Sequence, residues 1–159
     1  MKKLLFVLVV VFVAETMIAQ ADTAVIVPQA VSSAFTTRFP TAQLKKWEQR
    51  QQGYIAVFRQ NGQKLFAYYS ADGSWIGTEF PISWSKDVPV AVKKAWKKDG
   101  YASWKRDEVK RIDYPDSLVY VVYVDNSPTL NAEHMYIDAE KWALFYNQKG
   151  ELVRKEIAE

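Results

Sequence analysis

The phrase VPVAVKKAW at residues 88–96 closely repeats VPQAVSSAF at residues 27–35, with five of nine positions identical. The proline near the start of each copy suits the first turn of a helix, where a missing backbone N–H breaks no hydrogen bond. Apolar residues then recur at helical spacing, as at Val88, Val92 and Trp96. Each copy therefore predicts a short helix with one apolar stripe to bury, and the pair predicts a duplicated fold.

Strand-like segments separated by turn residues follow each predicted helix. Gln52-Gly53, Asn61-Gly62 and Asp72-Gly73 divide residues 45–80 into four such segments. Asn-Gly and Asp-Gly favour hairpins, because a type I′ turn needs positive φ at both central residues. After the second helix, strand-like segments lie at residues 106–113, 117–125, 133–139, 141–147 and 151–157.

The ends of the two units match as well. YYSADGSWI at residues 68–76 aligns with FYNQKGELV at residues 145–153, and the second unit is longer by sixteen residues between Pro115 and Ala139. The predicted class is α+β, with two tandem repeats that each contain a helix and a four-stranded antiparallel meander. Because one such unit has little core of its own, we expect the sheets to join or pack together. Both helices would then share one face and leave an open, concave face opposite.

The start of the chain has the pattern of an export signal. Lys2 and Lys3 precede an uncharged apolar run at residues 4–14, and Ala19-Gln20-Ala21 fits a signal peptidase site. An uncleaved membrane anchor is the alternative, which the short apolar run disfavours. We expect a periplasmic or secreted protein without stable membrane insertion, divided into a signal peptide at 1–21, a first repeat at 22–80, a linker at 81–87 and a second repeat at 88–159.

Composition disfavours several classes of function. The 21 basic and 18 acidic residues nearly balance, so nucleic acid is not an expected partner. The chain has no Cys, and His134 is its only His, which argues against a zinc site. Asp22, Asp125 and Asp138 lack the spacing of a calcium loop. No serine lies in a G-x-S-x-G turn, so we predict a protein without cofactors that is not an enzyme, with His134 in a structural or surface role.

The repeated phrase is followed by Phe39-Pro40, Trp47, Tyr54 to Phe58 and Asp72-Gly73. This pattern resembles the PepSY-like domains of secreted bacterial proteins. These domains are also similar to the β-lactamase inhibitory protein (BLIP). The resemblance covers nearly the whole chain after the leader as two copies, although the second lacks a counterpart of Phe39-Pro40. It implies a non-enzymatic, exported, BLIP-like fold with a concave sheet. Some relatives of this architecture bind and inhibit enzymes, but the target of the inhibitory protein is not carried over to a chain without cysteines.

Aromatic and aliphatic side chains on the open sheet face are the candidate binding residues. Neighbouring strand residues point to opposite faces, so small residues such as Ala56 and Ala67 under the helix would leave larger ones on the other side. The candidates are Ile55, Val57, Phe66, Tyr68, Trp75 and, by the repeat alignment, Phe145. Rigid aromatics on such a face suit a protein partner, here an envelope or secreted protein. The alternative is that both faces are buried, because an exposed antiparallel face is normally polar.

The outward faces of the two predicted helices differ. The first carries hydroxyl side chains, whereas the second carries Lys93, Lys94, Lys97 and Lys98, with Lys105, Arg106, Lys110 and Arg111 downstream. This basic face gives an alternative function, an envelope scaffold or a protein that binds a small ligand or anion. A solvated helix face is the simpler interpretation, because acidic residues are interleaved at Asp99, Asp107, Glu108 and Asp113.

Overall fold

The computed structural model describes residues 25–51, 53–127 and 140–158. The predicted signal peptide, Asp22, His134, Asp138 and the strand expected at residues 133–139 lie outside the described residues. Among the described residues, neither helix reaches the length and hydrophobicity of a membrane span.

The eight described strands form one antiparallel sheet, and their order across the sheet follows their order along the chain. The two units join edge to edge, because β4 pairs with β5. The predicted α+β fold of two helix-plus-meander units is confirmed. Its elements are α1 (Gln29–Arg38), β1 (Gln43–Arg50), β2 (Gly53–Gln60), β3 (Gln63–Tyr69), β4 (Trp75–Pro81), α2 (Val90–Lys98), β5 (Lys105–Asp113), β6 (Leu118–Asp125), β7 (Lys141–Tyr146) and β8 (Leu152–Ile157).

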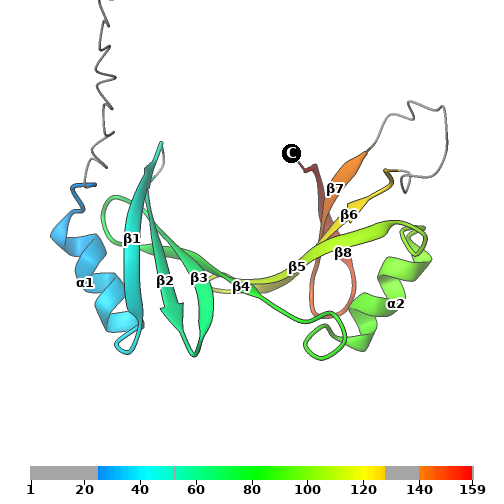
Figure 1. Cartoon of the computed structure of the whole chain (residues 1–159), viewed down its shortest axis with the longest axis horizontal. Coiled ribbons are helices and arrows are strands. Elements are labelled where there is room, and N and C mark those ends of the chain that lie inside the picture. The colour runs from blue at the N-terminus through cyan, green and yellow to red at the C-terminus, as the bar shows by residue number, and fades with distance from the viewer. Residues whose placement is uncertain (1–24, 52, 128–139, 159) are drawn as a thin grey trace, which may run out of the picture.

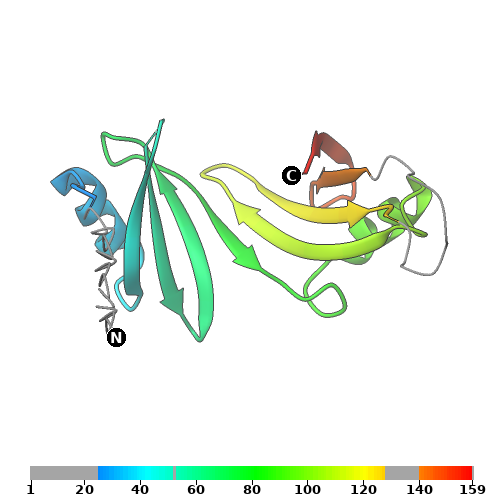
Figure 2. The same ribbon diagram turned by 45° about the horizontal axis from the view of Figure 1, so that its top comes forward.

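The sheet is strongly curved, and both helices lie on its convex side at opposite ends (Figure 1). Figure 2 shows the strands following one another from the α1 end to the α2 end. No described helix covers the concave side between the two ends. The expectation that the helices share one face, opposite a concave sheet face, is therefore confirmed.

Each helix buries the stripe that the repeated phrase predicts. The buried residues of α1 are Val31 and Phe35, and those of α2 are Val92 and Trp96. In both helices the proline of the phrase occupies the position directly before the first helical residue, where the chain needs no N–H donor.

The alternation of residues in β2 and β3 explains how α1 packs on the sheet. Ala56 and Ala67 are cross-strand partners and are fully buried in the cluster that contains Val31 and Phe35. Their small side chains leave room for the helix, in agreement with the placement assumed from the sequence. A corresponding cluster under α2 includes Leu144.

The hairpin turn after the third strand of each unit packs against the start of that unit's helix. Gly73 and Gly150 both have positive φ, at 91° and 84°. A Cβ atom at Gly73 would lie 2.8 Å from the Ala30 carbonyl oxygen, and one at Gly150 would lie 2.6 Å from that of Ala91. Ala30 and Ala91 hold the same place in the repeated phrase, so both units use the same close contact.

The predicted hairpins differ in their turn geometry. Asn61 and Gly62 both have positive φ, at 51° and 79°, as a type I′ turn requires. Asp72-Gly73 also forms a hairpin, but only the glycine has positive φ. The position of the second turn was predicted correctly, whereas a type I′ geometry does not apply to it.

Two equivalent tyrosines differ in how their hydroxyl groups are satisfied, and this gives a first testable prediction. The Tyr146 hydroxyl donates to Asp99 Oδ2 at 3.1 Å, whereas the buried Tyr69 hydroxyl has no hydrogen-bond partner in the described part of the chain. An unpaired buried polar group costs about 1–3 kcal/mol, while losing one hydrogen bond costs about 1 kcal/mol. Urea unfolding should therefore show that Tyr69→Phe raises the free energy of unfolding by about 1 kcal/mol and that Tyr146→Phe lowers it by a similar amount.

The pH dependence of stability tests the burial of the Tyr69 hydroxyl. Burial raises the pKa of Tyr69 to about 12, above the unfolded value of about 10. The folded state therefore holds the proton more tightly, and the associated stability is complete below about pH 10 and is lost as the pH rises towards 12. Tyr69→Phe should make this alkaline loss of stability shallower. Equal destabilisation by both Phe variants would contradict the difference between the two hydroxyls.

Candidate functional site

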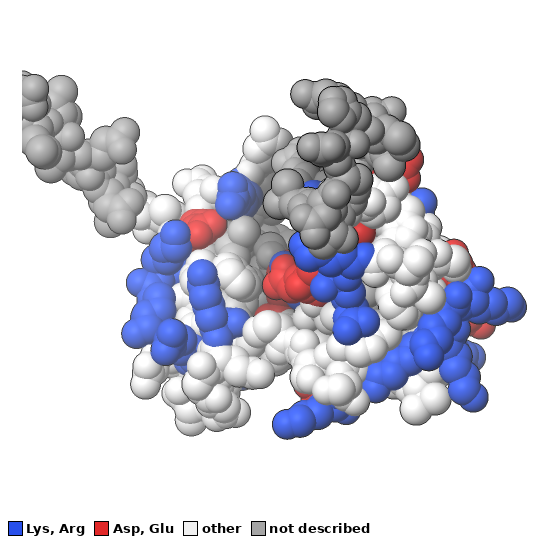
Figure 3. Space-filling view, turned by 45° about the vertical axis from the view of Figure 1, so that its right-hand side comes forward, with Lys and Arg blue, Asp and Glu red and all other residues white. Residues whose placement is uncertain are grey.

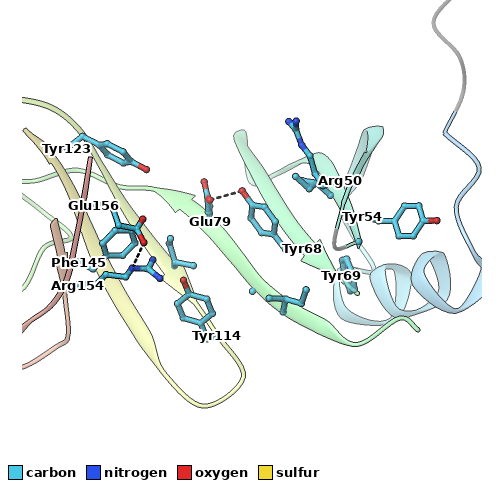
Figure 4. Close-up of a pocket in the computed structure, with 15 residues that line it drawn as sticks. Arg50, Tyr54, Tyr68, Tyr69, Glu79, Tyr114, Tyr123, Phe145, Arg154 and Glu156 are labelled. Carbon is cyan, nitrogen blue, oxygen red and sulfur yellow. Dashed lines mark hydrogen bonds and ion pairs between the residues drawn. The ribbon is translucent and has the colours of Figure 1, made fainter. Parts of the chain in front are cut away.

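A cavity of about 500 Å³ lies on the concave face of the sheet. Its lining comes from strands of both units, so the cavity exists only because β4 and β5 join them. Figure 4 shows Tyr68 and Glu79 on one side of this space and Tyr114, Phe145 and Arg154 on the other. Tyr54 and Tyr69 contribute to the lining, but their side chains pack in the cluster under α1.

The floor of the cavity is apolar and rigid. Ile55, Ile112 and Phe145 line it and are at most 9% exposed. Phe145 and Ile112 belong to a small cluster with Val121 and Ala143 on the concave side. Because these side chains are already packed, their positions are set before any partner binds.

A polar network centred on Glu79 crosses the junction between the units. The Tyr68 hydroxyl donates to Glu79 Oε1 at 2.6 Å, and Lys110 Nζ lies 3.5 Å from Glu79 Oε2. Burial and the hydrogen bond to Glu79 raise the pKa of Tyr68. Burial alone would lower the pKa of Lys110, but the Glu79 and Glu108 carboxylates raise it overall. Both raised pKa values keep the Tyr68 phenol and the Lys110 ammonium group protonated at neutral pH.

Arginine side chains lie at two edges of the cavity. The Arg154 guanidinium lies 3.8 Å from the centre of the Phe145 ring, and its Nε is 3.1 Å from Glu156 Oε1. Arg50 lies in the first unit (Figure 4) and is 3.1 Å from Glu48 Oε2. The arrangement combines an apolar floor with tyrosine hydroxyls and ion pairs, which suits a bound group that is partly apolar and partly polar.

The structure brings together only some of the predicted site residues. Ile55, Tyr68 and Phe145 line the cavity, while Val57 and Phe66 pair with each other beside it. The prediction that these side chains form an open face is only partly right, because Ile55, Val57 and Phe145 are buried whereas Phe66 and Tyr68 are half-buried. On a concave surface, neighbouring side chains converge and cover one another.

The prediction that Trp75 shares the open face is wrong. Its indole packs in the cluster under α1, its Nε1–H donates to Thr78 Oγ1 at 2.9 Å, and the Arg38 guanidinium lies 3.2 Å from its ring centre. The physical reason is a register shift in the β3–β4 pairing between Tyr68 and Tyr69. This irregularity places Trp75 opposite Tyr69, on the helix side, instead of on the side that simple alternation predicts.

Sequence reasoning missed several residues of the cavity, among them Glu79, Tyr114, Tyr123 and Arg154. Alternation in β6 could have identified Tyr123, because it points to the same side as Val121, the partner of Phe145. Glu79 and Arg154 carry no such local signal. They join the site through their pairing with Phe66 and Phe145 in neighbouring strands.

Two of the four basic residues downstream of α2, Lys110 and Arg111, have partners on the sheet and are not part of one patch with the lysines of α2. Lys110 belongs to the concave network with Glu79, while the Arg111 guanidinium lies over the Phe80 ring at 4.3 Å and pairs with Asp113.

Among the described residues, no group of His, Cys, Asp or Glu is arranged to hold a metal ion.

Comparisons with known proteins agree with the fold. The sequence profile of a family described as "Putative beta-lactamase-inhibitor-like, PepSY-like" matches residues 16–68 and residues 52–154. The second of these matches alone spans more than half of the chain. The sequence matches none of the curated proteins.

Several solved structures have a similar fold. A BLIP-like protein from Bacteroides fragilis has 25% identity and a TM-score of 0.68, with 86% of this chain and 89% of that chain covered. A DUF2874 family protein from Bacteroides ovatus has 24% identity and a TM-score of 0.70, with 84% and 89% covered. A protein from Bacteroides eggerthii described as "putative periplasmic" has 22% identity and a TM-score of 0.69, with 83% and 89% covered.

Proposed function

The chain belongs to the PepSY-like family, and from that premise we propose that it is an exported, non-catalytic binding protein that holds a protein partner in the hollow of its sheet. The observation that carries the proposal is the cavity of about 500 Å³ on the concave face, lined by both units. A segment projecting from a partner could enter this space, while the neighbouring strands contact the surface around it.

The chemistry of the cavity supports a protein partner. Tyrosine and arginine are enriched among the residues that contribute most to protein interfaces, and here Tyr68, Tyr123 and Arg154 surround a packed apolar floor. The exposed Ile76 also lines the cavity, and half-buried Phe66 lies beside it in β3. A preformed floor also lowers the entropic cost of association, because few side chains must be ordered.

An inhibitor-like role outside the cytoplasm is consistent with the family and with the sequence. The family description refers to β-lactamase inhibitors, one similar structure is described as BLIP-like and another as "putative periplasmic". Residues 1–21 have the pattern of a cleaved signal peptide. We infer that the partner is an envelope or secreted protein, and that inhibition would arise by occlusion and not by chemistry on the partner.

Crosslinking pull-down from the native envelope, followed by mass spectrometry, would identify the partner. Affinity for that partner should then fall at least about tenfold in Tyr68→Ala and in Arg154→Ala, because each removes a polar or cationic contact of the cavity from a residue type that often dominates binding energy. Trp75→Ala is the matched control, since it removes a large aromatic side chain from the opposite face of the sheet. Its affinity should remain close to that of the unmodified protein.

The outcome that would contradict the proposal is equally specific. Unchanged affinity in Tyr68→Ala and Arg154→Ala, with both variants folded by circular dichroism, would place the partner elsewhere. Loss of affinity in Trp75→Ala alone would assign binding to the helix side of the sheet.

A further inference from the structure

The outer face of α2 carries cations without partners. Lys94, Lys97 and Lys98 are exposed, and none of their side chains has an ion pair or hydrogen bond with any residue in the described part of the chain. Lys93 differs, because its Nζ donates to the Ser85 carbonyl oxygen at 2.9 Å. The described ion pairs lie instead on residues of the sheet, as at Lys110 and Arg154.

The first unit provides an internal comparison for this face. α1 buries the same side as α2, yet at the equivalent outward positions it carries Ser33, Thr36 and Thr37. Packing of the helix on the sheet therefore does not require lysines. Residues 86–106 contain seven basic and two acidic side chains, whereas the equivalent residues 25–45 contain two basic and none acidic.

The two acidic residues near α2 are directed to other partners. Asp87 Oδ2 accepts a hydrogen bond from the Ser83 backbone N–H at 2.8 Å, and Asp99 Oδ2 accepts one from the Tyr146 hydroxyl. Neither has an ion pair with a lysine of α2 within the described residues. Figure 3, in which the α2 end is turned towards the viewer, shows Lys and Arg side chains gathered over this end of the molecule.

We propose that the outer face of α2 docks on an anionic lipid surface. A lipid surface fits better than a specific anionic site, because the face contains lysines and no arginine that could form a bidentate fork with one phosphate. Val90 lies one turn before Lys94 and two turns before Lys97 on the same side of the helix, and its side chain is 65% exposed. An apolar side chain among lysines suits the boundary between headgroups and acyl chains.

The position of α2 also allows both faces of the protein to be used together. The helix lies on the convex side, whereas the cavity lies on the concave side (Figure 1). Docking through α2 would therefore leave the cavity directed away from the lipid surface and accessible to a partner. This inference does not depend on the proposed function of the cavity, because the residues involved are different.

Vesicle sedimentation with the full chain tests the proposal. Partition onto phosphatidylglycerol vesicles should exceed partition onto phosphatidylcholine vesicles and should fall as salt is raised. In the triple variant Lys94→Ser, Lys97→Thr, Lys98→Thr, which copies the outer face of α1, this preference should fall roughly a hundredfold, since each lysine near an anionic surface contributes about a fivefold change. Every variant carries the same apolar leader, so any partition that the leader causes is the same in all of them.

The reverse transfer supplies the matched control. The triple variant of α1 with Ser33→Lys, Thr36→Lys and Thr37→Lys should have a stronger preference for phosphatidylglycerol. The variant Tyr68→Ala should have the same preference as the unmodified chain. An unchanged preference in the α2 triple variant, with its fold verified by circular dichroism, would overturn the proposal. So would equal partition of the unmodified chain onto both lipids. Lysine-dependent binding to an acidic protein without vesicle binding would assign the face to that class of partner instead.

Discussion

Gly150→Ala is expected to lower the free energy of unfolding by about 3 kcal/mol. A Cβ atom at this position would lie 2.6 Å from the Ala91 carbonyl oxygen, so the hairpin turn and the start of α2 would have to separate. The residue also has φ of 84°, a conformation that costs a non-glycine residue roughly 1–2 kcal/mol. Overpacking against rigid backbone adds roughly 1–3 kcal/mol, and urea unfolding measures the total.

Gly100→Ala separates the two contributions. Gly100 has a similar φ of 88°, but no atom lies within 4 Å of a Cβ added there. This variant should lose only about 1–2 kcal/mol, the conformational part alone. Gly73→Ala should behave like Gly150→Ala, because its Cβ would meet the Ala30 carbonyl oxygen at 2.8 Å. Equal losses at Gly100 and Gly150 would mean that the contact between turn and helix contributes nothing.

Phe58→Ala should produce the second large effect, a loss of about 3–5 kcal/mol. Phe58 is fully buried under α1, and the centre of its ring lies 5.1 Å from that of Phe35 and 4.7 Å from that of Phe39. Truncation would leave a cavity that surrounding aromatic rings cannot fill without moving the helix. Because folded domains are stable by only about 5–15 kcal/mol, this change removes a large share of the total.

Phe66→Ala is the matched control for Phe58→Ala, since it removes the same side chain from the other face of the sheet. Phe66 is half-buried on the concave side, so its truncation should cost less than half as much. Thermal and urea unfolding of both variants measure the difference. A similar loss in the two variants would indicate that the concave face contributes to stability as much as the core under the helix.

Much of the fold follows from local patterns. The repeated phrase identified α1 and α2, because helix formation and the buried stripe depend on residues three and four positions apart. Asn61-Gly62 identified a hairpin for a similarly local reason, the need for positive φ at two successive residues. Alternation in β2 and β3 correctly separated Ala56 from Ile55 and Val57, and Ala67 from Phe66 and Tyr68, because the side-chain period of a strand is two.

Local patterns failed where pairing between strands intervened. Trp75 lies on the helix side because the register shifts between Tyr68 and Tyr69, and the place of such a shift depends on the pairing of β3 with β4. The burial of Val57 and Phe145 depends on the curvature of the whole sheet. The length of a strand and the polarity of its residues do not specify that curvature.

Local sequence patterns are enough to predict two units built alike, the buried face of each helix, and the lysines that α2 carries where α1 carries hydroxyl groups. They do not predict that β4 and β5 join the units into one curved sheet, or that Tyr68, Glu79, Phe145 and Arg154 meet around one cavity. The difference lies in the sequence distance over which the interactions act. Helices, turns and alternation depend on neighbours along the chain, whereas a site made by both units depends on strand pairing and curvature that act between distant residues.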